Sequence, residues 1–436
     1  MLIKEYTQQL QSKKTTAKDT ATHYIEKISQ NKHLNAVIEL NPNALNDAEE
    51  IDKMELRPTP LQGFPILIKD NINTADTTAT SAGSLSLTNN IALQDAPMVQ
   101  LLRKAGAVIL GKSNTTEFAN YMVDYREFQG MPNGYSSRGG QCLHPVDPDT
   151  DPSGSSTGSA VAVAAGLAPV AIGSETYGSI ISPSQRCGIV GIKPTALSIS
   201  TSGVIPISNT LDIVGPMATS VEDAAVVLGI LQEKEYTITP KTTARVGVYK
   251  SEGWKVTQEW LDANQTLLQK MKLIGMIVID LPNEPINESF VFEIMRYEFK
   301  ASINAYLSKY ANTNAPKDLT EIIKFNNDNP ETALKYGQNN LLAANEIGDD
   351  WQANPVYTKA MADRENAISR LDNLFAENDL DIVFMESSHC GLAAGTGFPS
   401  ITFPIGKTAA GLPIGCCLVA RRSREDLLIN IASALA

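Results

Sequence analysis

The sequence predicts one large α/β domain with helices on both faces of its sheet. Short apolar, strand-like runs alternate with helical patterns along 436 residues, of which 43% are hydrophobic and 19% are charged. A chain of this length could form roughly two or three ordinary domains, but it contains no internal repeat and no low-complexity linker. One α/β domain over residues 1–436 is therefore the economical prediction.

Residues 1–60 are predicted to be helical. Apolar residues recur at helical spacing in 15–28, and a second helix is expected over 42–54, where Pro42 suits a first turn. Residues 1–10 lack the basic and long apolar regions of a signal peptide. No apolar run approaches the roughly 18–20 residues of a membrane span. We therefore expect a cytoplasmic protein without a membrane partner.

The stretch 61–230 combines predicted strands and helices with one long loop. Residues 120–153 are rich in Gly, Pro, Ser and Asp, and so long a loop in a compact domain is usually functional. The motif Ser220-Val-Glu-Asp223 resembles a capping box at the start of a helix. The predicted elements are strand 61–68, helix 97–105, strand 107–110, helix 159–167, strand 169–172 and helix 220–228.

Beyond residue 245, predicted strands again alternate with helical patterns, as is typical of α/β proteins. The strands are expected at 245–249, 276–281, 382–385, 399–404 and 413–419. The more polar stretch 283–352 separates some of them.

Charge and composition narrow the classes of partner and cofactor. A formal net charge of −12 argues against nucleic acid or an anionic membrane as the main partner. The five cysteines form no C-x-x-C pair, which is typical of reduced thiols in a cytoplasm. The four histidines show no ligand spacing, so no metal site is expected.

Residues 106–113 match the Walker A pattern letter by letter, as G-A-V-I-L-G-K-S. That pattern binds phosphate because a flexible loop wraps it with backbone amides. Here the four intervening residues are strand formers, so we expect a strand rather than a phosphate loop.

Residues 154–158 (G-S-S-T-G) match the nucleophile-elbow motif G-x-S-x-G, with Ser156 at its centre. An α/β-hydrolase of that type needs an acidic residue and then a histidine further along the chain. The only downstream histidine is His389, and nothing around it marks an acidic partner on a separate strand end. A Ser–His–Asp triad is therefore disfavoured, and the serines need another base.

The segment 152–195 holds two clusters of Ser and Gly separated by an apolar run, a pattern that indicates an active site. Lysine can activate serine when burial lowers its pKa enough to leave a neutral amine. The best candidate is Lys69, at the end of the apolar run 64–68. A lysine at a strand end is more often a surface residue, so this assignment needs further support.

That support comes from a resemblance that covers most of the chain. Residues 61–75, 101–118, 152–195, 211–217 and 397–404 resemble, in the right order, the motifs of the amidase signature family. The resemblance implies that family's fold, with a mixed, twisted central β-sheet covered by helices on both faces. It also implies N-terminal helices in 1–60, a catalytic signature core in 61–230 and a variable substrate-side region in 285–395.

The resemblance assigns a catalytic triad by motif. Lys69 would be the base, Ser155 the serine in an unusual cis peptide, and Ser179 the nucleophile. Backbone amides of Thr176, Tyr177 and Gly178 would form the oxyanion hole. Tyr177 and Met131 are candidates for the substrate pocket. This chemistry needs no cofactor and no metal.

The sequence also departs from the general family pattern. Residues 133–141 and the S-E-T-x-G-S-I motif at 174–180 are most similar to the peptide-amidase branch. Tyr177 stands where the family usually has glycine, or aspartate in that branch. A phenol there should narrow the acyl pocket or offer a hydrogen bond to substrate. Because all three triad residues remain, we expect an active enzyme with unusual specificity.

We therefore expect a hydrolase that cleaves the carbon–nitrogen bond of a small acyl amide or of a peptide C-terminal amide. An amidase subunit of a tRNA-dependent amidotransferase is the first alternative, disfavoured by loop 133–141 and by the lack of basic patches. An acyltransferase with an amine acceptor and a catalytically weak homologue on the same fold are the others. The sequence leaves open the physiological substrate and the oligomeric state, a homodimer included.

Overall fold

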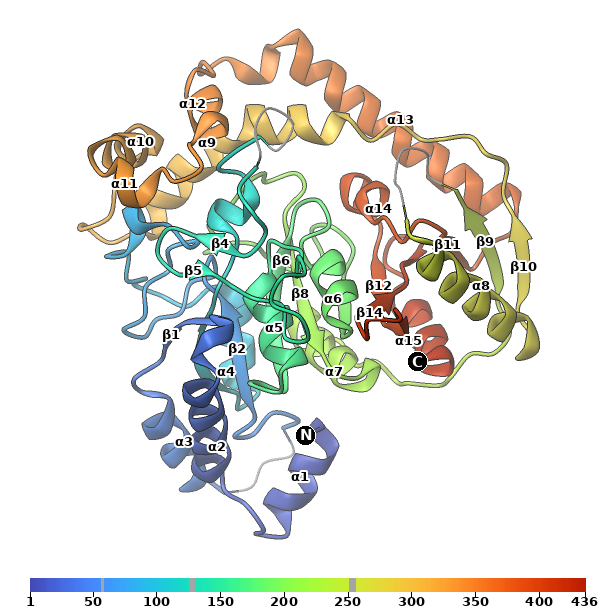
Figure 1. Cartoon of the computed structure of the whole chain (residues 1–436), viewed down its shortest axis with the longest axis horizontal. Helices are drawn as coiled ribbons and strands as arrows, with labels where there is room; N and C mark the ends of the chain where they lie inside the picture. Colours follow the sequence, from blue (N-terminus) through green and yellow to red (C-terminus); the bar gives the residue numbers. More distant parts are fainter. Residues whose placement is uncertain (56–58, 125–129, 251–255) are drawn as a thin grey trace.

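The computed structural model describes residues 1–55, 59–124, 130–250 and 256–436. Its centre is a continuous eleven-stranded sheet of these residues, in the order β1-β3-β2-β6-β8-β7-β12-β15-β11-β9-β10 (Figure 1). The strands are β1 (Val37–Leu40), β2 (Pro65–Lys69), β3 (Val108–Ser113), β6 (Val170–Glu175), β7 (Val190–Lys193), β8 (Ile213–Ala218), β9 (Arg245–Tyr249), β10 (Ile277–Asp280), β11 (Ile382–Met385), β12 (Ser400–Thr402) and β15 (Leu418–Ala420). Two short hairpins lie outside it, β4 (Tyr135–Ser136) with β5 (Gly140–Gln141) and β13 (Pro404–Lys407) with β14 (Pro413–Gly415).

The sheet is mixed. Strands β3, β2 and β6 are parallel, as are β11, β9 and β10, while the strands between these two groups pair antiparallel. Successive side chains of a strand point to opposite faces, and the core divides accordingly. Ile66 and Ile68 join one apolar cluster while Leu67 between them joins another. The sheet therefore buries both faces, as the sequence predicts.

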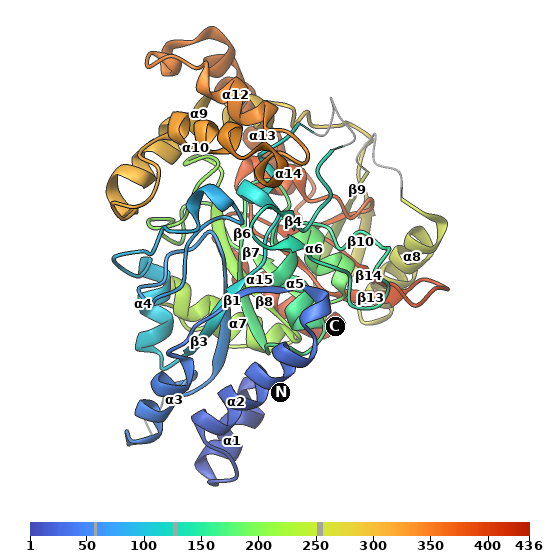
Figure 2. The ribbon, with the colours of Figure 1, turned by 60° about the vertical axis from the view of Figure 1, so that its left-hand side comes forward.

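Helices cover both faces. α4 (Pro97–Lys104), α7 (Val221–Gln232), α8 (Gln258–Leu273) and α15 (Glu425–Leu435) pack on one face, with α1 (Ile3–Gln11) at its edge. α2 (Ala17–Gln30), α3 (Ala44–Asp52), α5 (Thr157–Ala164) and α6 (Ile181–Cys187) cover the other. A further layer is formed by α9 (Phe290–Tyr310), α10 (Leu319–Asp328), α11 (Pro330–Ala333), α12 (Asn339–Asn345), α13 (Pro355–Glu377) and α14 (Gly391–Thr396). Helices α9 to α13 lie along the upper side of the molecule in Figure 1, and the labelled ones also lie at the top of Figure 2.

Most predicted elements are present near their expected bounds, and three differences have physical reasons. The region 1–60 is not wholly helical, because Val37–Leu40 form strand β1, which pairs with β3. The predicted strands 399–404 and 413–419 are each divided, because β13 and β14 pair with each other in a hairpin while β12 and β15 pair in the main sheet. At α7, Ser220 Oγ accepts the amide of Asp223, but the Asp223 carboxylate accepts the amide of Ile3 instead of closing the predicted capping box.

No helix among the described residues is both long and apolar enough to cross a membrane.

Candidate active site

The predicted triad residues come from three segments that meet at the carboxyl ends of two parallel strands. Lys69 is the last residue of β2, which pairs with β6. Ser155 lies just before α5, and Ser179 lies in the turn between β6 and α6. Carboxyl ends of parallel strands share one sheet edge, which is where open α/β sheets commonly bind ligands. The structure thus brings Lys69 and the two serine clusters together.

Four oxygen atoms surround the Lys69 amine, which is fully buried. Its Nζ lies 2.8 Å from Ser155 Oγ and 3.0 Å from Ser156 Oγ. It also lies 3.0 Å from Ser174 Oγ and 3.3 Å from the Ser174 carbonyl oxygen. Burial disfavours the charged form and lowers the pKa of Lys69 to about 7, although Asp212 and Glu175 act in the opposite direction. Near neutral pH a substantial fraction of this lysine is therefore a neutral amine.

The hydroxyl group of Ser156, the serine of the elbow-like motif, makes hydrogen bonds to both Lys69 and Ser174. Its Oγ donates to the Ser174 carbonyl oxygen at 3.0 Å and accepts from the Ser174 amide at 3.2 Å, besides its contact with Lys69. Ser155 Oγ has only Lys69 as a described hydrogen-bond partner. The peptide bond between Gly154 and Ser155 is cis, the configuration that the family resemblance implies. Of the two adjacent serines, Ser155 is the one with a hydroxyl proton still available.

Ser179 lies at the wall of a cavity of about 340 Å³. Its side chain is not hydrogen-bonded to any described residue, and its carbonyl oxygen accepts the amide of Ser156 at 3.2 Å. Gly154 also lines the cavity, whereas Ser155 and Ser156 are fully buried behind it. A ligand in this cavity can therefore contact Ser179 directly, with Ser155 and Lys69 in the layer beneath.

The turn that carries Ser179 is fixed by two buried carboxylates. Glu175 Oε2 accepts the amides of Ile180 at 2.7 Å and Ile181 at 3.0 Å, and the Gly178 amide also favours its charged form. Asp212 accepts the Thr176 hydroxyl at 2.5 Å, while burial raises the pKa of Asp212 to about 6. No described residue accepts a hydrogen bond from the amides of Thr176 or Ser179.

The two predicted pocket residues differ in position. Tyr177 lines the cavity beside Thr176 and Ser179. Its hydroxyl donates to Glu288 Oε1 at 2.7 Å, so the hydroxyl proton is directed to Glu288 and not to a substrate. Met131 is instead buried in an apolar cluster with residues of α9 and is not part of the cavity wall. Loop 120–153 lines the cavity at 120–124, while its residues 125–129 lie outside the described part of the chain.

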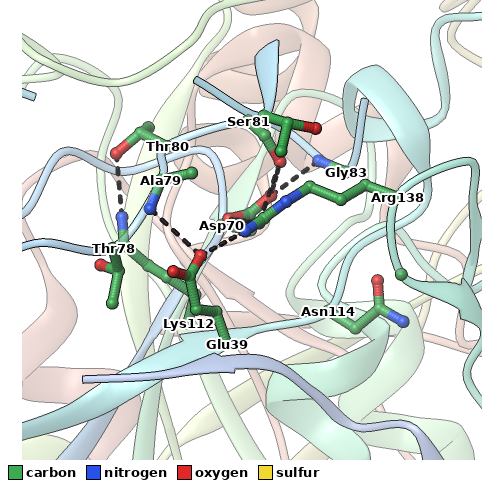
Figure 3. Close-up of polar contacts among 12 residues, drawn as sticks. Glu39, Asp70, Thr78, Ala79, Thr80, Ser81, Gly83, Lys112, Asn114 and Arg138 are labelled. Carbon is green, nitrogen blue, oxygen red and sulfur yellow. Dashed lines mark hydrogen bonds and ion pairs between the residues drawn. The ribbon is translucent and has the colours of Figure 1, made fainter. Parts of the chain in front are cut away.

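A charged network that the sequence analysis did not identify lies next to Lys69. The buried Asp70 carboxylate accepts hydrogen bonds from Ser81 Oγ and from the Gly83 amide at 2.8 Å. Arg138 lies between Asp70, at 3.3 Å, and Glu39 of β1 (Figure 3). The network ties loop 130–141 to the ends of β1 and β2. No short motif joins these three residues, so only the fold brings them together.

Lys112, the lysine of the Walker-like match, belongs to β3 and not to a phosphate loop. It is fully buried, and its Nζ donates to the Ile72 carbonyl oxygen at 2.5 Å. Its Nζ also donates to Thr80 Oγ1 at 2.9 Å (Figure 3). His389 pairs with Glu288 at 2.6 Å rather than with any serine of the site. The described residues contain no group of three His, Cys, Asp or Glu able to hold a metal ion.

The chain belongs to the amidase (amidase signature) family, whose model matches residues 19–390. It is therefore an amidase, and both the family resemblance and the mixed α/β fold predicted from the sequence are confirmed.

Three relatives illustrate the range of the family. A "Probable amidase" of Arabidopsis thaliana is 34% identical over 97% of this chain and 86% of its own length. Native peptide amidase from Stenotrophomonas maltophilia superposes with a TM-score of 0.88 at 32% identity, covering 100% of this chain and 96% of its own. One subunit of the glutamyl-tRNA(Gln) amidotransferase of Methanosarcina mazei is 30% identical over 96% of this chain and 93% of its own length. The peptide-amidase structure agrees with the branch indicated by loop 133–141.

Proposed function

We propose that this amidase hydrolyses the carbon–nitrogen bond of a carboxamide through an acyl-enzyme on Ser179, with Ser155 and Lys69 as proton relay and base. The observation that carries the proposal is the 2.8 Å contact between Lys69 Nζ and Ser155 Oγ, directly behind a cavity whose wall includes Ser179. A base that reaches the nucleophile through a second hydroxyl can remove the proton of the nucleophile, as acyl transfer by serine needs.

In the first half-reaction, the Ser179 oxygen attacks the carbonyl carbon of the amide. The Ser179 proton passes to Ser155, whose own proton passes to neutral Lys69. Backbone amides of Thr176 and Tyr177, two of the three predicted for the oxyanion hole, stabilise the oxyanion that forms, whereas the Gly178 amide is directed to Glu175. The proton then returns by the same route to the leaving nitrogen, the carbon–nitrogen bond breaks, and ammonia or an amine departs.

In the second half-reaction, water attacks the acyl-enzyme. Ser155 and Lys69 accept a proton from the water and return it to Ser179 as the carbon–oxygen bond breaks. The products are the carboxylic acid and free enzyme.

The hydrogen-bond donors and acceptors around Lys69 favour Ser155 over Ser156 as the relay. A neutral amine has two N–H donors and one lone pair, and the Ser174 carbonyl oxygen can only accept. Ser156 already donates its proton to that same carbonyl. In the proposed mechanism the lone pair of the neutral amine is turned to Ser155, 2.8 Å from Nζ, whose hydroxyl then donates to it.

The cavity supports a substrate with a small acyl group or a peptide end. Its volume of about 340 Å³ is at the low end for ligand pockets. Residues of α9 and α12 form its outer wall, including Phe292, Arg296 and Asn339. They lie in the region 285–395, which we expected to vary with substrate. The physiological amide is proposed to be a small acyl amide or a peptide C-terminal amide.

A fluorophosphonate probe followed by peptide mapping tests the identity of the nucleophile. We expect the probe on Ser179 and none on Ser156. Ser179→Ala should lose both labelling and hydrolysis of a graded amide panel that includes glutamine and peptide amides. Hydrolysis of glutamine alone would favour an ammonia-delivering subunit similar to the amidotransferase relative. Labelling of Ser156 with Ser179 untouched would contradict the proposed mechanism.

A further inference from the structure

The Tyr177 side chain reaches from the catalytic cavity to a second set of residues. Its ring packs edge-on against Phe292 of the catalytic cavity, with centroids 5.4 Å apart. On another side it packs edge-on against the His389 ring, with centroids 5.8 Å apart. Its hydroxyl donates to Glu288 Oε1 at 2.7 Å, and the same oxygen lies 2.6 Å from His389 Nε2. The phenol is thus held by two ring contacts and a hydrogen bond.

Glu288 and His389 line a second cavity of about 320 Å³. Its other described walls are mainly apolar and include Ile286, Met385 and Leu392. Tyr177 is in the wall of the first cavity and contacts two residues in the wall of the second. Its side chain therefore lies in the wall of the first cavity, and Glu288 and His389 lie between it and the second cavity, which is of nearly equal size.

The backbone makes room for this arrangement at Gly391, the first residue of α14. A Cβ atom there would lie 2.7 Å from the Tyr177 ring and 2.4 Å from His389 Nε2. Both distances are too short for a stable contact, so any side chain at this position would displace the phenol or the imidazole.

We propose that Tyr177 is a fixed partition between the catalytic cavity and the second cavity, and that Glu288 and His389 are positioning residues that hold it and so limit the acyl group. The inference rests on the proposed function, because it concerns the acyl group bound at Ser179. The ligand class that the partition excludes is an amide with a bulky, largely apolar acyl group, which the joined cavities would accept.

The polar contacts give the partition its rigidity. Glu288 and His389 have side chains that are 20% and 9% exposed, so a hydrogen bond between these groups is only partly screened by water. A phenol without this contact could rotate about its side-chain bonds into either cavity. Loss of the contact should therefore relax selectivity less than loss of the ring itself.

The test compares two fluorophosphonates that carry the same leaving group, one with a small alkyl substituent and one with a biphenyl substituent. The second-order rate of labelling at Ser179 is measured for each probe, and the bulky-to-small ratio is the readout. The variants are Tyr177→Ala, Tyr177→Phe, Glu288→Ala and His389→Ala. Tyr297→Phe is a matched control, since its hydroxyl bonds Asn354 on the same helix layer but lines neither cavity. Glu284→Gln, an exposed change in the segment that carries Glu288, is the second control.

We expect Tyr177→Ala to raise the bulky-to-small ratio by roughly tenfold or more, as differences in pocket volume typically do. Tyr177→Phe, Glu288→Ala and His389→Ala should raise it by a smaller factor, and both controls should keep the parent ratio. The Phe variant retains the ring, so it keeps the test valid if the Ala variant fails to fold.

Three results would overturn the proposal. An unchanged ratio in Tyr177→Ala and Tyr177→Phe, with labelling still on Ser179, means that the ring does not limit the acyl group. If the bulky-to-small ratio rises in Tyr177→Ala but keeps the parent value in Glu288→Ala and His389→Ala, then Glu288 and His389 do not position Tyr177. Folded parent protein that is not labelled at Ser179 contradicts the proposed function and the inference with it.

Discussion

Oxygen atoms of three serines, and no carboxylate, are the described hydrogen-bond partners of Lys69. Hydroxyl and carbonyl groups stabilise an ammonium ion less than a carboxylate in contact with it does. Burial therefore has the largest effect on the pKa of Lys69. The serines around it, which include Ser155 of the proposed relay, offset that effect less than a carboxylate in contact would. Lys112, also fully buried, has Asp70 as the leading influence that favours its charge, and burial lowers its pKa to about 8.

This difference predicts the pH dependence of catalysis. The proposed base is the neutral form of Lys69, so protonation below its pKa should abolish activity, and kcat/KM should rise with pH through about 7 to a plateau. Steady-state rates on one small amide from pH 5 to 9 measure the inflection. Lys112→Met is the matched control, since it removes a buried lysine that contacts no serine of the site and should keep the inflection. A shift of the inflection in Lys112→Met would contradict the role of Lys69. A rate of the parent enzyme that does not fall below pH 6 would contradict it as well.

Removal of the base should be more severe. We expect Lys69→Ala to lower kcat by roughly 10²–10⁴-fold, the usual contribution of a general base. Lys69→Met, which fills the buried space, should be equally inactive and at least as stable, as measured by chemical denaturation. Activity within tenfold of the parent in either variant would exclude a Ser–Ser–Lys mechanism.

At the same scale, the sequence predicted part of the site. Lys69, Ser155 and Ser179 could be assigned because long motifs of the family contain them. Glu288 could not be found in this way, since its contact with Tyr177 joins segments that are far apart in the chain and carry no shared motif. Met131 was placed wrongly for a related reason, because an apolar side chain gives no signal that separates a cavity wall from a packed core.

At the scale of elements, loop 130–141 is attached to the sheet by charge. Asp70 at the end of β2 and Glu39 of β1 both contact Arg138, and the side chains of Asp70 and Arg138 are 0% and 12% exposed. The loop is therefore held by residues at β1 and β2, two strands that lie far before it in the sequence. An isolated buried carboxylate is costly.

We predict that Arg138→Ala lowers the free energy of unfolding by about 3 kcal/mol, since it leaves Asp70 without its guanidinium partner. Arg424→Ala, which breaks an exposed pair with Asp426, should cost less than about 1 kcal/mol. The double variant Asp70→Asn with Arg138→Met should cost less than the sum of its single changes, because neither member of the pair then leaves the other's charge without its partner. Equal effects of Arg138→Ala and Arg424→Ala in urea denaturation would show that the network does not anchor the loop.

Strand β1, which the sequence did not predict, was missed for a physical reason. Strand β1 is only four residues long and lies between two strong helical patterns, so periodicity alone assigns it to a helix. What defines it is its neighbour in β3, where a Cβ at Gly111 would lie 2.3 Å from the Glu39 carbonyl oxygen. Pairing with a distant strand thus overrides the local pattern.

For the whole molecule, buried ionisable groups should shape the dependence of stability on pH. Burial raises the pKa of Glu117 to about 7, so the folded state keeps a proton that the unfolded chain loses near 4.5. That contribution to stability is complete below about pH 4.5 and is lost as the pH rises to 7. Burial lowers the pKa of Lys69 and Lys112 to about 7 and 8, so their contribution is complete above 10.5 and is lost as the pH falls through those values.

We therefore predict that Glu117→Gln flattens the acid side of the stability profile. The difference in unfolding free energy between parent and variant should change by on the order of 3 kcal/mol from pH 4.5 to 7. Glu284→Gln, an exposed change, should run parallel to the parent. Denaturant titrations at a series of pH values provide the measurement, and a constant difference between parent and Glu117→Gln would contradict the shifted ionisation.

The strand order places a seam between the two halves of the sheet at β7 and β12, where Ser400 pairs with Lys193. Every strand to one side of this seam comes from the N-terminal half of the chain, and every strand to the other side comes from the C-terminal half. During synthesis, the half of the sheet that holds Lys69 and the two serine clusters therefore has an open edge at β7 until β12 has left the ribosome. An unpaired strand edge is a template for association with other chains. Nascent chains arrested before residue 400 should accordingly bind chaperones more than chains arrested after both β12 and β15 have left the ribosome.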